Sequence, residues 1–171
     1  MLHVYYGNGK GKTTAAVGLA VRAAGAGMNV LFMQFLKDGS SSEIGILQDI
    51  GNMRVITCKS CGGFVFSMND TEKETVCHEH DEMLKNADDS LKSHSAYMIV
   101  LDEFADAYDM GMLSTEKAED LINKYADTNE IVVTGHSLPR FLSEKARYIT
   151  LMQAEKHPFN DGISARKGVE Y

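Results

Sequence analysis

The segment from residue 7 to residue 14 carries the clearest chemistry in the chain, with the sequence Gly7-Asn8-Gly9-Lys10-Gly11-Lys12-Thr13-Thr14. A turn built on alternating glycines lets several backbone N–H groups point at one anion. Lys12 adds a mobile positive charge, and the hydroxyl of Thr13 suits a magnesium ion held between phosphate oxygens. The segment therefore predicts a phosphate-binding loop.

The loop departs from the general pattern G-x-x-x-x-G-K-[ST], because that pattern would place its first glycine at Tyr6. The glycines stand at positions 7, 9 and 11 instead. A surface turn without a ligand is the alternative interpretation. An apolar strand before the loop and an alanine-rich helix after it favour phosphate binding, since a strand and a helix are the context this motif requires.

A pair of carboxylates, Asp102-Glu103, follows the apolar run of residues 97–101. In a chain that begins with a phosphate loop, an apolar strand ending in Asp-Glu is typical of a magnesium-holding Walker B element. We therefore predict a magnesium site formed by Thr13, Asp102 and Glu103. The alternative is an acidic helix start that simply follows a strand.

All three cysteines lie in one window, in the spacing Cys58-x-x-Cys61 and Cys77-x-x-His80. Three sulfurs and one imidazole make a tetrahedral zinc set, so a structural zinc ion is one interpretation. The other is a loop pair of cysteines beside one face of a helical turn. The odd number of cysteines indicates reduced thiols in the cytoplasm rather than disulfides.

The apolar pattern supplies strands and helices in alternation to position these residues. Strands are expected over residues 2–6, 29–36, 54–57, 97–101, 130–134 and 147–152, and helices over 13–25, 43–50, 70–92, 114–125 and 138–146. This alternation indicates an α/β fold, a mostly parallel sheet with helices on both faces. The phosphate loop, Asp102-Glu103 and Gly135-His136 should then meet beyond the carboxyl ends of the strands, where such sheets bind ligands.

The bulk properties bound the function. A chain of 171 residues with 44% hydrophobic content is expected to form a single domain over residues 1–171, with 156–171 as an irregular functional tail. The formal net charge of −7 argues against nucleic-acid binding. No run approaches the roughly 20 apolar residues of a membrane span, and no secretion signal is visible. These features favour a cytoplasmic protein.

Several short motifs are informative when taken together: the loop from Gly7 to Ala15, Arg22-Ala23, Gln34-Phe35-Leu36-Lys37, Gly63-Phe64, Leu101-Asp102-Glu103, Thr134-Gly135 and the ending Lys156-His157-Pro158-Phe159 with Gly162 to Tyr171. As a set they resemble the P-loop type of ATP:corrinoid adenosyltransferase. The resemblance spans nearly the whole chain and implies a P-loop nucleotide-hydrolase type of fold. It also implies transfer of the 5′-deoxyadenosyl group of ATP to Co(I) of a corrinoid, with release of triphosphate.

The resemblance further implies roles for individual residues. Lys12, Phe64 and Phe66 would be catalytic, the two aromatics by displacing the lower axial ligand of cobalt; two core phenylalanines are the alternative. Nucleotide contacts would come from the whole loop, Gly7, Asn8, Gly9, Lys10, Gly11, Lys12, Thr13 and Thr14, and from Arg22, His136, Lys156 and Phe159. The resemblance also implies a reduced flavoprotein as electron donor and a homodimer.

Two departures from the family pattern affect these expectations. His136 stands where the family usually has a phosphate-facing arginine, and an imidazole is a weaker, pH-dependent donor. The usual N-terminal extension before the first strand is missing from this sequence. Two other functions explain part of the pattern, namely a zinc-bearing P-loop nucleoside kinase and a nucleotide-binding regulatory ATPase. Neither explains the terminal segment.

Overall fold

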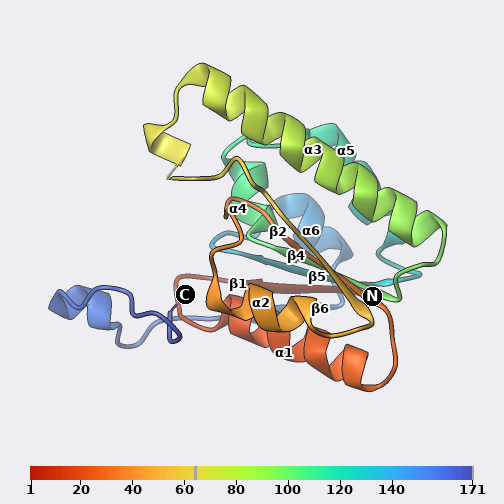
Figure 1. Cartoon of the computed structure of the whole chain (residues 1–171), viewed down its shortest axis with the longest axis horizontal. Helices are drawn as coiled ribbons and strands as arrows, with labels where there is room; N and C mark the ends of the chain where they lie inside the picture. The colour runs from red at the N-terminus through yellow and green to blue at the C-terminus, as the bar shows by residue number, and fades with distance from the viewer. Residues whose placement is uncertain (64, 171) are drawn as a thin grey trace.

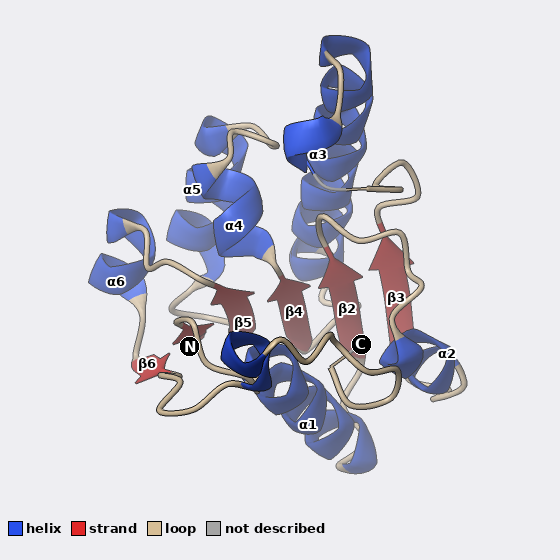
Figure 2. Cartoon of the chain, turned by 90° about the vertical axis from the view of Figure 1, so that its left-hand side faces the viewer, coloured by secondary structure: helices blue, strands red, loops and turns tan. Residues whose placement is uncertain are grey.

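The computed structural model describes residues 1–63 and 65–170. Its sheet has six strands in the order β3-β2-β4-β5-β1-β6, and every neighbouring pair is parallel (Figure 2). The strands are β1 (Leu2–Tyr6), β2 (Val30–Gln34), β3 (Met53–Thr57), β4 (Met98–Asp102), β5 (Glu130–Gly135) and β6 (Tyr148–Leu151). The expected α/β architecture with a parallel sheet is confirmed.

Helices cover both faces of this sheet, as predicted (Figure 1). One face carries α1 (Lys12–Gly25) and α2 (Ser42–Gln48). The opposite face carries α3 (Asp70–Lys92), α4 (Phe104–Asp109), α5 (Thr115–Tyr125) and α6 (Arg140–Lys145). Each face has its own apolar core, because successive side chains of a strand point to opposite sides of the sheet.

The strands at the centre of the sheet are apolar up to their last residues, Gln34 and Asp102, because both of their faces are covered. All five residues of β2 and of β4 are buried. On α1, alanines at positions 16, 20, 23 and 24 are buried, and these small side chains let the helix lie close to the sheet. The central strands therefore fix where their carboxyl ends, and the residues that follow them, stand.

Helix α3 begins where its capping residues predict. The side chain of Asn69 accepts a hydrogen bond from the N–H of Glu72, and the Glu72 carboxylate accepts one from the N–H of Asn69. This capping box satisfies two otherwise unpaired backbone donors at the start of the helix. The buried residues of α3 recur at helical spacing and pack on the core; they include Val76, His80, Met83, Leu84, Ala87 and Leu91.

The sequence did not predict α4. Glu103 adopts a left-handed backbone conformation with φ of 60°, and α4 starts directly after it. Strand β2 also ends two residues earlier than expected, since Leu36 has φ of 56° and leaves the extended conformation. Both left-handed turns lie at the carboxyl edge of the sheet. None of the described helices combines the length and apolar character that crossing a membrane requires.

The segment after β6 contains the short 3-10 helix η2 (Pro158–Asp161) and is largely exposed. It projects from the body of the molecule and returns toward the start of α1 (Figure 1). Its first part is tied to the phosphate loop, since the N–H of Ala154 donates to Asn8 Oδ1 over 3.2 Å. The C-terminal segment is thereby placed beside the loop.

Candidate functional site

The phosphate loop connects β1 to α1 and depends on its glycines. Gly7 and Gly11 have φ of 118° and 114°, which residues with a Cβ rarely adopt. Gly9 lies against the main chain after β6, where an added Cβ would come within 2.8 Å of the Met152 carbonyl carbon and oxygen. The N–H of Gly9 donates to that same oxygen over 2.7 Å. The glycine at position 9 is thus explained by the main chain after β6, which passes too close to the loop to leave room for a side chain.

A cavity of about 300 Å³ opens at this loop. It brings together most of the predicted phosphate-site residues with four from the tail, and is lined by Asn8, Gly9, Lys10, Gly11, Lys12, Thr13, Thr14, Lys37, Glu103, His136, His157, Ala165, Val169 and Glu170. Lys12 folds over the loop, its Nζ donating to the carbonyl oxygen of Gly9 over 3.0 Å. Three lysines and a helix N-terminus around one cavity suit a polyanion.

Asp102 is the buried centre of the predicted magnesium set. Its Oδ1 accepts from the hydroxyls of Thr13 and Thr134, each over 2.8 Å, and its Oδ2 accepts from Gln34 Nε2 over 3.1 Å. Burial raises the pKa of this carboxyl in spite of these donors. Among the described residues, Gln34 Oε1 is a buried oxygen with no hydrogen-bond partner. A hydroxyl, two carboxylates and a spare amide oxygen are ligands that fit hydrated magnesium.

Lys37 is a site residue that the sequence interpretation did not select. Its Nζ lies 2.9 Å from Glu103 Oε1 and 3.8 Å from Asp102 Oδ2. Burial acts to lower the pKa of Lys37, but the carboxylates of Glu103 and Asp102 outweigh burial, so the pKa is raised. The signal was present, because Lys37 belongs to one of the motifs that carry the family resemblance.

His136 reaches the loop cavity, and Asp106 fixes it there. The backbone N–H of His136 donates to Asp106 Oδ1 over 3.0 Å, and its Nδ1 lies 3.1 Å from Asp106 Oδ2. Ligand atoms of Glu103, Asp106 and His136 all fall within 4.8 Å of one another. Asp106 was missed because it lies on α4, which the sequence did not predict. The imidazole keeps its other nitrogen for a ligand.

A second and larger cavity, about 950 Å³, lies beyond the carboxyl end of β2 on the side of α3. Its lining comprises Leu36, Gly63, Val65, Phe66, Asp70, Lys73, Glu74, Cys77, Met110, Gly111 and Met112. Phe66, on the 3-10 helix η1 (Val65–Ser67), is 84% exposed, which excludes a core role. Phe64, the other predicted aromatic, lies outside the described residues. This volume suits a large organic ligand.

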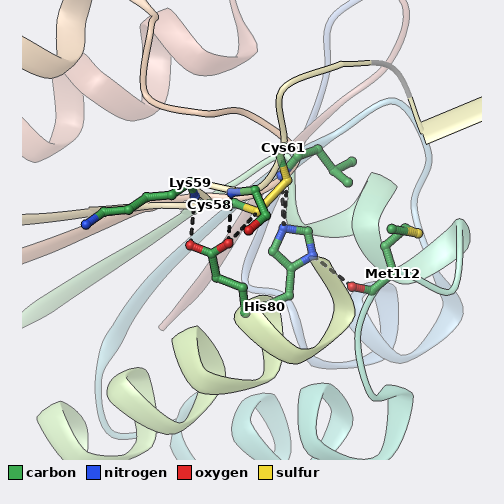
Figure 3. The surroundings of a disulfide bond; sticks show 8 residues. Cys58, Lys59, Cys61, His80 and Met112 are labelled. Atoms are coloured by element: carbon green, nitrogen blue, oxygen red, sulfur yellow. Dashed lines mark hydrogen bonds between the residues drawn. A yellow bond between two sulfur atoms is a disulfide. The ribbon is translucent and has the colours of Figure 1, made fainter. Parts of the chain in front are cut away.

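The cysteines correct one expectation and rearrange another. Cys58 and Cys61 are joined by a disulfide, so the prediction of reduced thiols is wrong for this pair (Figure 3). The tight turn after β3 places their Cα atoms 5.6 Å apart, which lies within the range of disulfides. The structure does not bring the four predicted zinc ligands together. His80 joins Cys58 and Cys61 in one cluster, whereas Cys77 is a free thiol facing the carbonyl oxygen of Gly111.

Three predicted nucleotide contacts are not brought to the loop. Arg22 is exposed in the last turn of α1, ten residues and so roughly 15 Å along the helix from Lys12. Lys156 and Phe159 are exposed on the C-terminal segment. None of the three lines the loop cavity, whereas their neighbour His157 does. Their contacts with a nucleotide stay predictions.

Comparisons with known proteins agree with this architecture. The family model described as "ATP:corrinoid adenosyltransferase BtuR/CobO/CobP" matches residues 1–171. The chain is 31% identical over 170 residues to the corrinoid adenosyltransferase of Escherichia coli strain K12, covering 98% of this chain and 84% of that protein. It is 31% identical over 171 residues to the corrinoid adenosyltransferase of Pseudomonas aeruginosa, covering 100% and 83%.

A third relative is also a corrinoid adenosyltransferase. The corrinoid adenosyltransferase CobA of Salmonella typhimurium is 30% identical over 174 residues, covering 98% of this chain and 84% of that protein. The three relatives cover 98–100% of the chain, and the family model spans residues 1–171, from the phosphate loop to the C-terminal segment. The chain therefore belongs to the ATP:corrinoid adenosyltransferase family, a family of enzymes.

Proposed function

We propose that this protein transfers the 5′-deoxyadenosyl group of ATP to Co(I) of a corrinoid and releases inorganic triphosphate. Family membership supports this reaction. The observation that carries it in the structure is the arrangement of two cavities at one edge of the sheet, a phosphate cradle and a much larger chamber. Leu36 lines the larger cavity and Lys37, the next residue, lines the smaller one.

The reaction requires little covalent chemistry from the protein. The electron pair of Co(I) attacks C5′ of ATP, the bond between C5′ and the triphosphate oxygen breaks, and triphosphate leaves with that bond's electron pair. The enzyme must hold C5′ in line with cobalt and stabilise charge on the leaving group. The loop N–H groups, Lys10 and Lys12 supply that stabilisation. Lys12 would exchange the Gly9 carbonyl, its present partner, for a phosphate oxygen.

Thr13, Asp102 and Glu103 would hold the magnesium ion that accompanies ATP. Bound there, magnesium neutralises part of the charge on the triphosphate. The donor set fits, since Thr13 and Asp102 already contact each other. Asp106 positions His136, which stands where the family pattern has an arginine; with Nδ1–H directed at Asp106, Nε2 would donate to a phosphate only when the ring is protonated.

The larger cavity would take the corrinoid, with Phe66 and Phe64 displacing the lower axial ligand of Co(II) so that it is reduced more easily. A reduced flavoprotein would supply the electron, and the enzyme would work in the cytoplasm as a homodimer. The reaction itself needs no zinc. Whether Cys58 and Cys61 bind a metal depends on whether they are reduced, and it is independent of the transfer reaction. The nucleoside-kinase and regulatory-ATPase alternatives are not favoured, because the family model matches the chain from end to end.

An anaerobic assay tests the reaction. Chemically reduced cobalamin and Mg-ATP are mixed with the enzyme, and the loss of Co(I) absorbance is followed. We expect a loss that needs both enzyme and ATP. Replacing Lys12 by Ala should slow it by about 10²–10³-fold, the effect of removing one donor from a developing charge. Lys85→Ala is the matched control, since Lys85 is exposed on α3 and should leave the rate unchanged. A Co(I) signal that persists with wild-type enzyme would reject the proposal.

The role of Phe66 is tested by changing the starting oxidation state of cobalt. With Co(II) cobalamin and a flavoprotein donor, Phe66→Ala should slow adenosylation, because the lower ligand then stays bound and reduction is harder. With cobalamin already reduced chemically to Co(I), the same variant should react at the wild-type rate. Equal slowing in both reactions would mean that Phe66 binds the corrinoid without acting on its lower ligand.

A further inference from the structure

We propose that Cys58 and Cys61 form a reversible dithiol–disulfide pair whose reduced form binds one zinc ion together with His80. The structure shows the oxidised form of this pair (Figure 3). Neither the transfer reaction nor the phosphate loop requires such a site. The inference therefore stands apart from the proposed function, and either can fail without the other.

The three side chains form a buried cluster assembled from separate elements. Cys58 follows β3 directly, Cys61 stands in the turn after it, and His80 comes from α3. They are 0%, 4% and 0% exposed, and their ligand atoms all lie within 4.8 Å of one another. The Cys61 Sγ to His80 Nε2 distance is 3.7 Å. Tetrahedral zinc with ordinary bond lengths holds a sulfur and a nitrogen about 3.6 Å apart.

His80 is held in the tautomer that a metal ligand needs. Its Nδ1 lies 2.8 Å from the carbonyl oxygen of Met112, and a carbonyl only accepts, so Nδ1 carries the proton. The lone pair is then on Nε2, the nitrogen that faces the cysteine pair (Figure 3). Metal-binding histidines characteristically donate their other N–H to such a carbonyl.

The surroundings add negative charge to the cluster. The carboxylate of Glu79 accepts the backbone N–H groups of Lys59 and Ser60 over 2.7 and 2.9 Å, so it is fixed against the turn between the cysteines. Its Oε2 lies 3.6 Å from Cys58 Sγ. Two thiolates beside this carboxylate would repel one another, and a divalent cation removes that repulsion. Zinc is the cation that prefers thiolate and imidazole ligands in such a set.

The disulfide and the zinc site exclude each other. Sulfurs in a disulfide are about 2.05 Å apart, whereas two thiolates on one tetrahedral zinc are about 3.8 Å apart. Reduction by a dithiol reductant adds two electrons and two protons to the Cys58–Cys61 bond, and the reductant becomes a disulfide. Zinc then displaces the two thiol protons. In the zinc form the Leu36 N–H, which now donates to His80 Nε2 over 3.2 Å, must turn to a sulfur.

The place of the disulfide in the chain also fits reversible reduction. It joins two residues with a sequence separation of 3, so it closes a short turn rather than linking distant segments. Cys77 is excluded from the cluster, since its Sγ faces Gly111 at the edge of the larger cavity. The chain therefore contains its own control for a thiol that does not bind the metal.

Zinc content and thiol titration of the full chain test the proposal. The protein is reduced, loaded with Zn²⁺, freed of excess metal and analysed for zinc, before and after oxidation with a small disulfide. We expect one zinc per chain in the reduced protein and none retained at this site after oxidation. Thiol titration after unfolding should find three thiols in the reduced protein and one in the oxidised protein. Wild type that binds no more zinc than Cys58→Ser would overturn the proposal, and so would three thiols after oxidation.

Variants separate this ligand set from others. Cys77→Ser should keep its zinc, whereas Cys58→Ser and Cys61→Ser should lose it. His80→Gln should weaken zinc binding by more than the roughly 10–100-fold that loss of an outer contact costs. Loss of zinc from Cys77→Ser would show a different site and contradict the assignment. Should the cysteine variants fail to fold, Co²⁺ added to reduced wild-type protein still decides, because two thiolate ligands give a sulfur-to-cobalt charge-transfer band that oxidation must abolish.

Discussion

At the scale of single residues, Asp102 is a side chain that lowers the stability of the folded protein in order to serve the site. It is fully buried, three side chains donate to it, and burial still raises its pKa. Gln34, one of those donors, leaves its own carbonyl oxygen without a partner among the described residues. A neutral side chain at position 102 would satisfy the folded protein better. The carboxylate is explained by what it is proposed to bind.

We predict that Asp102→Asn raises the thermal stability of the metal-free protein at neutral pH. A group whose pKa is raised on folding stabilises the fold below its ordinary value of 3.8, and loses that contribution as pH rises through the folded pKa. Asparagine does not titrate, and once the Gln34 amide has flipped, the asparagine N–H would donate to the Gln34 oxygen that now has no partner. A gain of about 1 kcal/mol would raise the melting temperature by roughly 2–4 °C in a chain of this size.

The measurement is thermal unfolding followed by circular dichroism between pH 5 and pH 8. The advantage of Asp102→Asn should grow as the pH rises. Asp88 provides a control of opposite sign, because its hydrogen bond with Lys124 lowers its pKa. Its contribution is present above the ordinary value and is lost as pH falls, so Asp88→Asn should not stabilise at pH 7. A less stable Asp102→Asn at neutral pH would contradict this account of the site.

At the scale of elements, the phosphate loop depends on the chain that follows β6. We predict that Gly9→Ala distorts the loop and abolishes tight ATP binding, because its Cβ would meet the main chain of Met152 and Gln153 within 2.9 Å. Gly18→Ala is the matched control, since no atom lies within 4 Å of a Cβ there and Gly18 stands inside α1. That control should bind ATP normally and gain about 0.5–1 kcal/mol of stability.

Isothermal titration with ATP and chemical denaturation of both variants check this prediction. Normal ATP affinity in Gly9→Ala would mean that the loop is not braced by the strand end beside it, and the explanation of the shifted glycines would then be wrong. Greater stability confined to Gly18→Ala would show that the two substitutions differ through contact rather than through helix propensity alone.

The elements also show what the sequence could predict. The strands were found because central strands covered on both faces form nearly continuous apolar runs, as β2 and β4 do before Gln34 and Asp102. The cap of α3 and the cap of α5 at Ser114 were recognisable from short-range chemistry. Helix α4 was missed, since it is only six residues long and begins after a left-handed Glu103. Asp106 was missed with it.

Other parts of the site depend on contacts between distant segments. Lys37 is placed by the carboxylates at the end of β4, and His157 reaches the loop only because the C-terminal segment turns back. Neither contact leaves a local pattern. The cysteine pair is the clearest case, because the spacing indicated a cluster with His80 correctly but could not distinguish a disulfide from free thiols or exclude Cys77.

At the scale of the whole molecule, the C-terminal segment belongs to the site although it adds little to the core. His157, Ala165, Val169 and Glu170 line the loop cavity, whereas most residues of this segment are exposed. We predict that a chain ending at Lys156 melts within about 2–4 °C of the full protein, the effect of roughly 1 kcal/mol. Its ATP affinity should fall about tenfold, which corresponds to about 1.4 kcal/mol.

Thermal unfolding and ATP titration of the shortened chain, beside the full protein, check both halves of that prediction. Unchanged ATP affinity would mean that the segment does not cover the nucleotide. A large loss of stability would mean that it packs as part of the fold instead.

The central claim is that the glycine–lysine loop holds the triphosphate of ATP as a leaving group. The most direct measurement is the identity of the phosphorus product in the anaerobic reaction with Co(I) cobalamin. The account predicts one inorganic triphosphate for each adenosylated corrinoid, with ADP no higher than in a reaction without enzyme. ADP as the main product, or cobalt alkylation with no triphosphate, would contradict it.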